Sequence, residues 1–502
     1  MLQVTVKRNQ YQDSVRLMAI SREAGSLPGV KKVLALLGTE SNKHVVGSLG
    51  LVDRDVEQAT PNDLLVCVEA SDPAAAGVAL ERVDALLRKD SGAGVGEIGN
   101  PASVEEASSR LAGASLALFS VPGPFAKLDV VAALEQGLDV MLFSDNVSIE
   151  DERFLKTLAA SKGLLLMGPD CGTAIIHGVA LAFANVVRRG DIGVVGASGT
   201  GIQEVTCLVE RMGGGISHAI GVGGRDLKKR VGGIMMSLAI QKLALDPMTR
   251  RLVIVSKPGD PEVVRRVLEE AAATRLEVVA CFLGGAEAAP KVPGVGIVDS
   301  LEGAALAVMG REEAEHGGRE EAVSSGRAFP PSRRYLRGLY SGGTLCYEAL
   351  LLAEGRLAVE SNIAPRKDLC IPHPARGRAH CCVDLGDDEF TVGRPHPMID
   401  STLRKERIVE DVRDPSVRVI LLDVVLGYGA SANPAGDIVD ALAEGRAGLA
   451  DDGPMVIAHV CGTEGDPQVL GLQEAKLREA GVRVFPSNAA AVRAALTALE
   501  AA

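Results

Sequence analysis

The 502-residue sequence contains no tryptophan, and aromatic residues make up only 3% of it. Proteins that bind single-stranded nucleic acids stack bases on aromatic side chains, so this scarcity argues against that function. The formal net charge of −12 argues equally against general binding to nucleic acids or anionic membranes. A local positive pocket for a small phosphate is compatible with both numbers.

Signals for secretion or membrane insertion are missing as well. No apolar run reaches the length of a membrane span, and the first residues, MLQVTVK, lack a signal-peptide pattern. The nine cysteines are scattered, form no CxxC pair and are odd in number, which favours free thiols over a disulfide framework. We therefore expect a cytoplasmic protein.

The sequence has only one group of residues that invites a metal. Cys370 and His373 precede His380, Cys381 and Cys382, and these residue types suit zinc. Their spacing fits no standard zinc finger, and adjacent cysteines would point to opposite faces of a strand. We predict no metal site.

Glycine, in contrast, is abundant, with 57 residues, and much of it follows apolar runs. This pattern of strand, tight turn and helix is typical of α/β domains with parallel sheets. Gly-rich or charged segments at 91–102 and 311–327 are predicted to be linkers. Together these signals predict four domains, at 1–90, 103–188, 189–310 and 334–502.

The first domain differs from the others in its pattern. Strands are predicted at 3–6, 30–37 and 64–69, and helices at 14–24 and 73–88. This order suits a small α+β domain of the ACT or ferredoxin-like kind. No residue pattern in this domain suggests a catalytic site.

The last two domains are predicted to be copies of one another. Thr200 and Glu204 recur 144 positions later as Thr344 and Glu348. Further along, Asp246-Pro247 recurs 168 positions later as Asp414-Pro415. The offset is therefore 24 residues larger there, which indicates an insertion in the second copy near 355–380. An internal duplication places equivalent loops in both copies.

The most informative loop joins a predicted strand at 192–195 to a predicted helix at 202–211. The first N–H groups of a helix lack internal partners and carry a partial positive charge, so they favour anions. No Gly-Lys-Ser/Thr follows, so the loop is not a Walker A motif. We expect it and its copy either to bind phosphate or carboxylate at one shared site, or to be plain helix caps. The residues concerned are Ser198, Gly199, Thr200 and Gly201, and Gly342, Gly343 and Thr344.

Other strand ends supply further candidates. Arg225 follows a GVGG turn and is expected either to bind an anion or to form a surface ion pair. His396 lies in a Pro-rich loop, and we name it as a catalytic candidate together with Thr200 and Thr344. The remaining predicted binding residues are Gly224, Asp226, Gly462 and Thr463.

Taken in order, several segments resemble the α subunit of succinyl-CoA synthetase and related NDP-forming acyl-CoA synthetases. They are VPGPF (121–125), GPDCG (168–172), GVVGASGTGIQEV (193–205), GVGGRD (221–226) and LDPMTRRLVIV (245–255). The N-terminal domain, the second copy, SGGTLCYEALLL and HVCGTEGDPQ resemble one branch, the FdrA family.

The resemblance implies an α/β fold with a Rossmann-like CoA-binding-type domain at 103–188. It also implies two flavodoxin-like ligase-type domains, at 189–310 and 334–502. It suggests CoA as a cofactor, contacted by Pro122, Gly123, Pro124, Asp170 and Cys171.

Two departures from the synthetases matter. No histidine lies between His218 and His316, where the synthetases carry their phosphorylated histidine, and no Gly-rich phosphate loop precedes residue 114. The FdrA resemblance instead implies oxamate carbamoyl transfer with partner subunits, using phosphate or carbamoyl phosphate as substrate. An acyl-CoA synthetase using CoA and ATP, and a non-catalytic scaffold, are the alternatives. A homodimer is compatible with each of the three.

Overall fold

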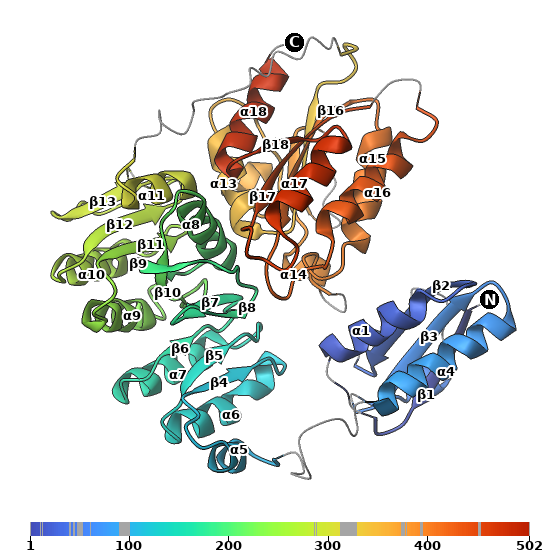
Figure 1. Ribbon diagram of the computed structural model, residues 1–502, viewed down its shortest axis with the longest axis horizontal. Coiled ribbons are helices and arrows are strands. Elements are labelled where there is room, and N and C mark those ends of the chain that lie inside the picture. Colours follow the sequence, from blue (N-terminus) through green and yellow to red (C-terminus); the bar gives the residue numbers. More distant parts are fainter. Residues whose placement is uncertain are drawn as a thin grey trace. The chain divides into compact units, whose positions relative to one another are not determined.

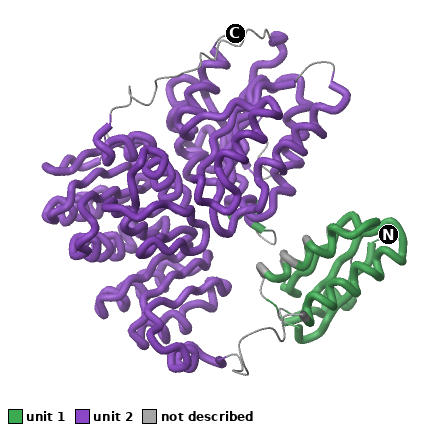
Figure 2. Tube along the Cα trace, viewed as in Figure 1, with its two compact units in different colours: residues 1–100, 388–395 green, residues 101–387, 396–502 purple. Residues whose placement is uncertain are grey.

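The chain divides into two units (Figure 2), one of residues 1–100 and 388–395 and one of 101–387 and 396–502. The computed structural model describes residues 2–89, 101–311, 329–391, 395–449 and 453–500, apart from gaps at 11, 13, 40–41, 44–45, 48–53, 61, 286, 288, 373–376 and 378. Most of both predicted linkers lies outside the described residues. Within the described part, no helix is long and apolar enough to cross a membrane.

The three strands predicted in the first unit form an antiparallel sheet in the order β1-β3-β2. Its elements are β1 (Leu2–Lys7), α1 (Ser14–Gly25), β2 (Val30–Leu37), α3 (Arg54–Glu57), β3 (Leu64–Ala70) and α4 (Pro73–Lys89). The central strand is apolar almost throughout because both of its faces are buried. Val66 packs in the cluster under α1 and α4, while Leu65 and Cys67 pack with Val56 of α3.

The second unit begins with α5 (Val104–Arg110) and a small parallel sheet, β4 (Leu116–Phe119), β5 (Asp139–Leu142) and β6 (Leu166–Met167). The helices α6 (Gly123–Glu135) and α7 (Ile149–Ser161) connect these strands. Pro124 fits the first turn of α6, where a missing N–H costs nothing.

A seven-stranded sheet follows, in the order β13-β12-β11-β9-β10-β7-β8 (Figure 1). Its strands are β7 (Thr173–Ile176), β8 (Val179–Ala182), β9 (Arg189–Gly196), β10 (Ile216–Gly221), β11 (Arg251–Ser256), β12 (Glu277–Phe282) and β13 (Val295–Val298). The β7–β8 hairpin pairs with β10, so this sheet includes residues that the sequence pattern assigns to the preceding domain. The helices α8 (Gly199–Arg211), α9 (Ile234–Leu245), α10 (Pro261–Ala272) and α11 (Leu301–Val308) flank it.

The last sheet repeats this arrangement and confirms the predicted duplication. Its order, β15-β14-β16-β17-β18, matches β10-β9-β11-β12-β13 strand for strand. The strands are β14 (Tyr335–Tyr340), β15 (Cys381–Asp384), β16 (Val417–Val425), β17 (Met455–Cys461) and β18 (Arg483–Phe485). The helices are α13 (Gly343–Ala353), α15 (Thr402–Arg413), α16 (Pro434–Arg446), α17 (Leu470–Glu479) and α18 (Asn488–Glu500).

The predicted insertion also lies where the offset puts it. Residues 212–215 join α8 to β10, whereas residues 354–380 join α13 to β15. Within this longer segment Glu360 forms a parallel bridge with Cys381, so the insertion supplies an edge partner for β15.

The two copies are locked together through a pair of buried glutamates. Glu204 of α8 accepts a hydrogen bond from the Asn488 N–H (3.2 Å), which opens α18. Glu348 of α13 accepts one from the Leu301 N–H (2.8 Å), which opens α11. Each copy therefore caps the last helix of the other, at the end where the helix dipole favours a negative charge.

The asymmetry between these glutamates generates a prediction on pH. Glu204 also pairs with His459 (2.7 Å), whereas burial raises the pKa of Glu348 to about 7. Between about pH 4.5 and 7, the Glu348 carboxyl is protonated in the folded protein and ionised in the unfolded protein. Stability must fall as the pH rises through this window.

In Glu348→Gln this contribution is lost, so the drop in unfolding free energy between pH 5 and pH 8 should shrink by on the order of 2 kcal/mol. Urea denaturation at the two pH values measures the change. Glu354→Gln, at the exposed end of the same helix, serves as the control. An equal pH dependence in Glu348→Gln and the native protein would contradict the assignment.

Candidate functional site

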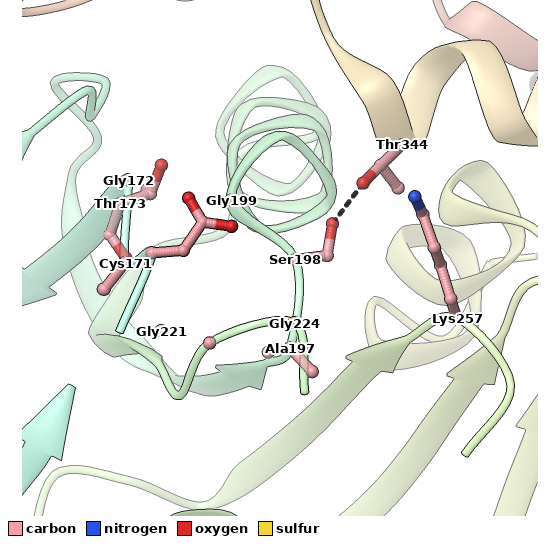
Figure 3. Close-up of a pocket in the computed structure, with 13 residues that line it drawn as sticks. Cys171, Gly172, Thr173, Ala197, Ser198, Gly199, Gly221, Gly224, Lys257 and Thr344 are labelled. Carbon is pink, nitrogen blue, oxygen red and sulfur yellow. Dashed lines mark hydrogen bonds between the residues drawn. The ribbon is translucent and has the colours of Figure 1, made fainter. Parts of the chain in front are cut away.

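The C-terminal ends of β9 and β10 open onto a pocket of about 200 Å³ (Figure 3). The chain crosses from β9 to β10 on one side and then from β10 back to β11 on the other side of β9, and such reversals of strand order are where α/β sheets bind ligands. The lining residues come from both copies and from the loop before β7. They are Asp170, Cys171, Gly172, Thr173, Gly196, Ala197, Ser198, Gly199, Gly221, Gly223, Gly224, Lys257 and Thr344.

Two hydroxyl groups meet at this pocket from the starts of α8 and α13. Ser198 Oγ caps α8 by accepting a hydrogen bond from the Gly201 N–H (3.0 Å). The same oxygen lies 2.6 Å from Thr344 Oγ1, as the dashed line in Figure 3 shows. Ser198, Gly199 and Thr344 thus bring the starts of both helices to one pocket.

Lys257 brings the only positive charge among the thirteen described lining residues. It follows β11 directly, and Figure 3 shows its amino group directed toward Thr344. Its Nζ lies 5.1 Å from the centroid of the Tyr347 ring, a cation–π contact. Sequence reasoning missed this residue, although a lysine at the end of a buried strand beside an anion loop was a usable signal.

The opposite wall of the pocket is formed by Asp170, Cys171 and Thr173. A Cβ on Gly221 would lie 2.6 Å from both Cys171 Sγ and the Thr173 carbonyl oxygen, so only glycine leaves this wall in place. Burial raises the pKa of Cys171 to about 12, and its thiol is therefore protonated at neutral pH. Cys171 can line the pocket, but it is not an activated nucleophile.

Arg225 and Asp226 do not reach the pocket, although Gly224 beside them does. The Arg225 guanidinium contacts Glu152 (2.8 Å) and the Val147 carbonyl oxygen (2.8 Å). Asp226 is completely buried and accepts a hydrogen bond from Lys156 Nζ (2.8 Å). These two residues therefore join α7 to the following sheet rather than binding a ligand.

The second predicted loop is occupied by the protein's own carboxylate. Asp423, at the end of β16, accepts hydrogen bonds from the N–H groups of Ser341 (2.9 Å) and Gly342 (2.7 Å). Arg404 pairs with the same carboxylate (2.8 Å). Gly342 and Gly343 consequently do not line the pocket, and only Thr344 of this loop does.

Several other predicted residues are absent from the described pocket lining and contact other parts of the chain. Thr200 lies against Gly342 and, like Gly201, is absent from the lining. Thr463 donates a hydrogen bond to the Val186 carbonyl oxygen (2.6 Å), and Gly462 packs on Leu426.

His396 is also a structural residue. Its Nδ1 accepts a hydrogen bond from the Met398 N–H (3.2 Å), and burial lowers its pKa to about 4. The ring is therefore neutral at pH 7, and it does not line the pocket.

The residues predicted to contact CoA divide into two groups. Asp170 and Cys171 line the pocket, whereas Pro122, Gly123 and Pro124 do not. Gly123 lies so close to the backbone of 145–147 that any Cβ would collide with it. The missing side chain of Gly123 allows α6 to pack on that loop, and it leaves no space for a ligand.

No cluster of three or more His, Cys, Asp or Glu side chains in the described residues is placed to hold a metal ion. His373, part of the group considered for zinc, lies outside those residues.

Comparison with known proteins gives the family. The chain is 42% identical over 497 residues to the uncharacterized protein YahF of Escherichia coli K12, with 97% of this chain and 96% of that protein covered. The chain belongs to the FdrA family of succinyl-CoA synthetase-like, NDP-forming proteins. Family models for a CoA-ligase (339–498), a CoA binding domain (187–285) and an AllF heavy metal-associated domain (1–101) also match. The CoA binding match lies on the seven-stranded sheet and not on 103–188.

More distant relatives are ligase subunits. The α subunit of the ADP-forming succinate–CoA ligase of Aquifex aeolicus is 30% identical over 171 residues, which cover 33% of this chain and 53% of that protein. Among solved structures, a dinucleotide-forming acetyl-coenzyme A synthetase of Ca. Korarchaeum cryptofilum aligns with 80% of this FdrA-family chain at 16% identity and a TM-score of 0.33. The structure is mixed α/β with parallel sheets, and the CoA binding and CoA-ligase models match its two larger sheets.

The ionic contacts of Arg225 and Asp226 generate a second prediction. Lys156 is fully buried and is bonded to Glu152 (2.7 Å) and Asp226. Lys156→Ala leaves two buried carboxylates without this cation, which should lower the free energy of unfolding by about 3–5 kcal/mol. Thermal or urea denaturation measures it.

Lys162→Ala, which removes only an exposed pair with Glu135 at the end of the same helix, should cost less than about 1 kcal/mol. An equal decrease in the free energy of unfolding in the two variants would show that the buried ion cluster contributes no more than the exposed pair.

Proposed function

We propose that the chain is an α-type subunit of an acyl-CoA synthetase-like enzyme and that its pocket binds the phosphoryl group of an acyl phosphate. The observation that carries the proposal is the convergence of Ser198, Thr344 and Lys257 at the start of α8. The helix start, two hydroxyl donors and an ammonium group supply the donors and the positive charge that a phosphoryl group requires. The ligase subunits among the relatives support the same class of reaction.

The donors also suit the reaction itself. When a nucleophile attacks the acyl carbon of an acyl phosphate, a bond to that carbon forms and the bond from carbon to the phosphate oxygen breaks. The departing phosphate takes the electron pair and its charge grows. Lys257 and the N-terminus of α8 stabilise that charge where it develops. The hydroxyl groups of Ser198 and Thr344 hold the phosphate oxygens in place.

The size of the pocket restricts what it can hold. A volume of about 200 Å³ is below the usual range for drug-sized ligands, so CoA as a whole does not fit there. We therefore assign to this pocket the acyl phosphate and no part of the CoA nucleotide. Of the residues expected to contact CoA, only Asp170 and Cys171 line it.

A second candidate is the transfer of a carbamoyl group, which converts oxalurate and phosphate to oxamate and carbamoyl phosphate. Here a phosphate oxygen attacks the carbamoyl carbon, and the carbon–nitrogen bond breaks as the nitrogen takes a proton. This candidate is favoured by the absence of histidine from the described pocket lining, because direct attack by phosphate needs no phosphorylated side chain. Carbamoyl phosphate is itself a small acyl phosphate, so the same donors serve it.

The test begins with binding of inorganic phosphate, measured by calorimetry. Lys257→Met should weaken binding by about 10–100-fold, because a charge-assisted hydrogen bond is lost in a partly enclosed site. Lys229→Met, at a well-exposed lysine on the same sheet's loops, should leave it unchanged. Unaltered affinity in Lys257→Met would contradict the assigned phosphoryl site.

Turnover then separates the two reactions. The chain is assayed with its partner subunits for ADP and thioester formation from ATP, CoA and an acid such as succinate. A parallel assay measures carbamoyl phosphate formed from oxalurate and phosphate. Thioester formation supports the synthetase, and carbamoyl phosphate formation supports the second candidate. The absence of both products from the assembled complex would refute an acyl-phosphate function.

A further inference from the structure

Two histidines outside the described pocket lining meet at the tip of the β7–β8 hairpin. His177 and Gly178 form the turn between the two strands, and His218 lies on β10, the strand on which the hairpin packs. The imidazole rings are in edge contact, with their centroids 4.4 Å apart. The His177 N–H also donates a hydrogen bond to His218 Nδ1 (3.3 Å). The neutral His218 ring therefore carries its proton on Nε2.

The turn itself does not require a histidine. His177 (φ 51°) and Gly178 (φ 82°) both have positive φ, the conformation of a two-residue hairpin turn. Asparagine, aspartate and glycine are the usual first residues of such turns. What the histidine adds to the turn is the ring that contacts His218. A positive φ outside glycine is uncommon, and it directs attention to the role of this side chain.

The tip of the hairpin has few other contacts that hold it on the sheet. Among the described residues of the hairpin, only Ile175 pairs in register with β10, at Ala219. Val179, next to the turn, is 60% exposed and gives the tip little apolar support. The base is held separately, because the Phe183 carbonyl oxygen accepts a hydrogen bond from Thr173 Oγ1 (2.7 Å). The histidine pair is therefore the main polar attachment of the tip.

The groups around His218 oppose a positive charge on its ring. Burial lowers the pKa of His218 most, and His177 lowers it further. Asp246, after α9, raises this pKa, and Arg189, at the start of β9, lowers it. The Asp246 carboxylate lies 3.6 Å from His218 Nε2, but it also accepts hydrogen bonds from the N–H and the hydroxyl of Thr249 (3.1 and 2.6 Å). The ring is consequently neutral at pH 7.

We propose that the contact between His177 and His218 holds the tip of the β7–β8 hairpin on β10 at neutral pH and releases it when His218 binds a proton. A proton on Nδ1 removes the acceptor of the His177 N–H and leaves a positive ring against a second imidazole. In the released tip, His218 is no longer covered and binds the proton more strongly. Acidification therefore favours the open state.

The hairpin lies between the pocket and the second copy, so its release affects a connection between them. Thr173, at the start of β7, lines the pocket. Asn185, just after β8, donates a hydrogen bond to the Asp466 carboxylate of the second copy (2.8 Å). Release of the tip leaves these two attachments joined by a less ordered segment. The inference concerns the free protein and does not depend on the proposed function.

Hydrogen exchange of the full chain, followed by mass spectrometry of peptides from 173–183, tests the inference. Protection is compared at pH 8 and pH 5 after correction for the intrinsic exchange rates. It should fall by about 3–10-fold at pH 5, since one backbone hydrogen bond is lost. His218→Asn places an amide oxygen near the position of Nδ1 and does not titrate, so its hairpin should keep the same protection at both pH values.

His380 of the second copy provides the matched control. Its Nδ1 also accepts a backbone N–H, from Leu336 (3.2 Å), and burial also lowers its pKa. His380→Asn should leave the pH response of the hairpin as it is in the native protein. Equal hairpin protection of the native protein at both pH values, or an undiminished response in His218→Asn, would overturn the proposal.

His177→Asn gives an independent test if His218→Asn does not fold, because asparagine followed by glycine suits this turn. The variant keeps the backbone N–H but removes the second imidazole. The pKa of His218, followed by NMR, should therefore rise toward its ordinary value. An unchanged pKa would overturn the assigned coupling between the rings. None of these measurements requires phosphate binding or turnover, so their outcome is independent of the proposed function.

Discussion

The exchange of helix caps between the two copies is the constraint on which the site depends. Glu204 and Glu348 are almost completely buried, and each satisfies a backbone N–H of the opposite copy. Because an unpaired buried carboxylate is costly, neither copy can move away without exposing or stranding one of these groups. Ser198 and Thr344 lie at the starts of the helices that carry Glu204 and Glu348, so the contact that joins the copies also fixes the distance between the two hydroxyls.

The duplication did not produce two equal sites. In the first copy, glycines at the strand ends line a pocket, and in the second copy Asp423 and Arg404 close the corresponding loop. The two copies still share their strand order and their helix caps, which hold them together. The lost symmetry lies in a few side chains at the strand ends, which are the positions that decide whether a ligand can enter.

Strands, helices and the duplication followed from local pattern, since apolar periodicity and Gly-rich turns are properties of short segments. The site was only partly predictable for the same reason. The sequence favoured Ser198, Gly199 and Thr344 because they start helices, but it could not show that Asp423 reaches Gly342 from a strand more than 80 residues away. For Lys257 the end of a buried strand was a usable signal, but its contact with Tyr347 of the other copy does not follow from the sequence. Arg225 and Asp226 had the right chemistry, but their partners on α7 are invisible to spacing along the chain.

The insertion in the second copy bears on how these sheets meet other proteins. Glu360 covers the outer edge of β15, as the short β7–β8 hairpin covers the equivalent edge of β10. Open edges invite strands from other chains, and short or irregular coverings are a common protection against such pairing. A protein that joined this chain by adding a strand at these edges would find little backbone to bond with. Stable assembly at this side of the sheets would therefore depend on side-chain surfaces, which recognise one partner shape, and not on backbone hydrogen bonding, which accepts almost any strand.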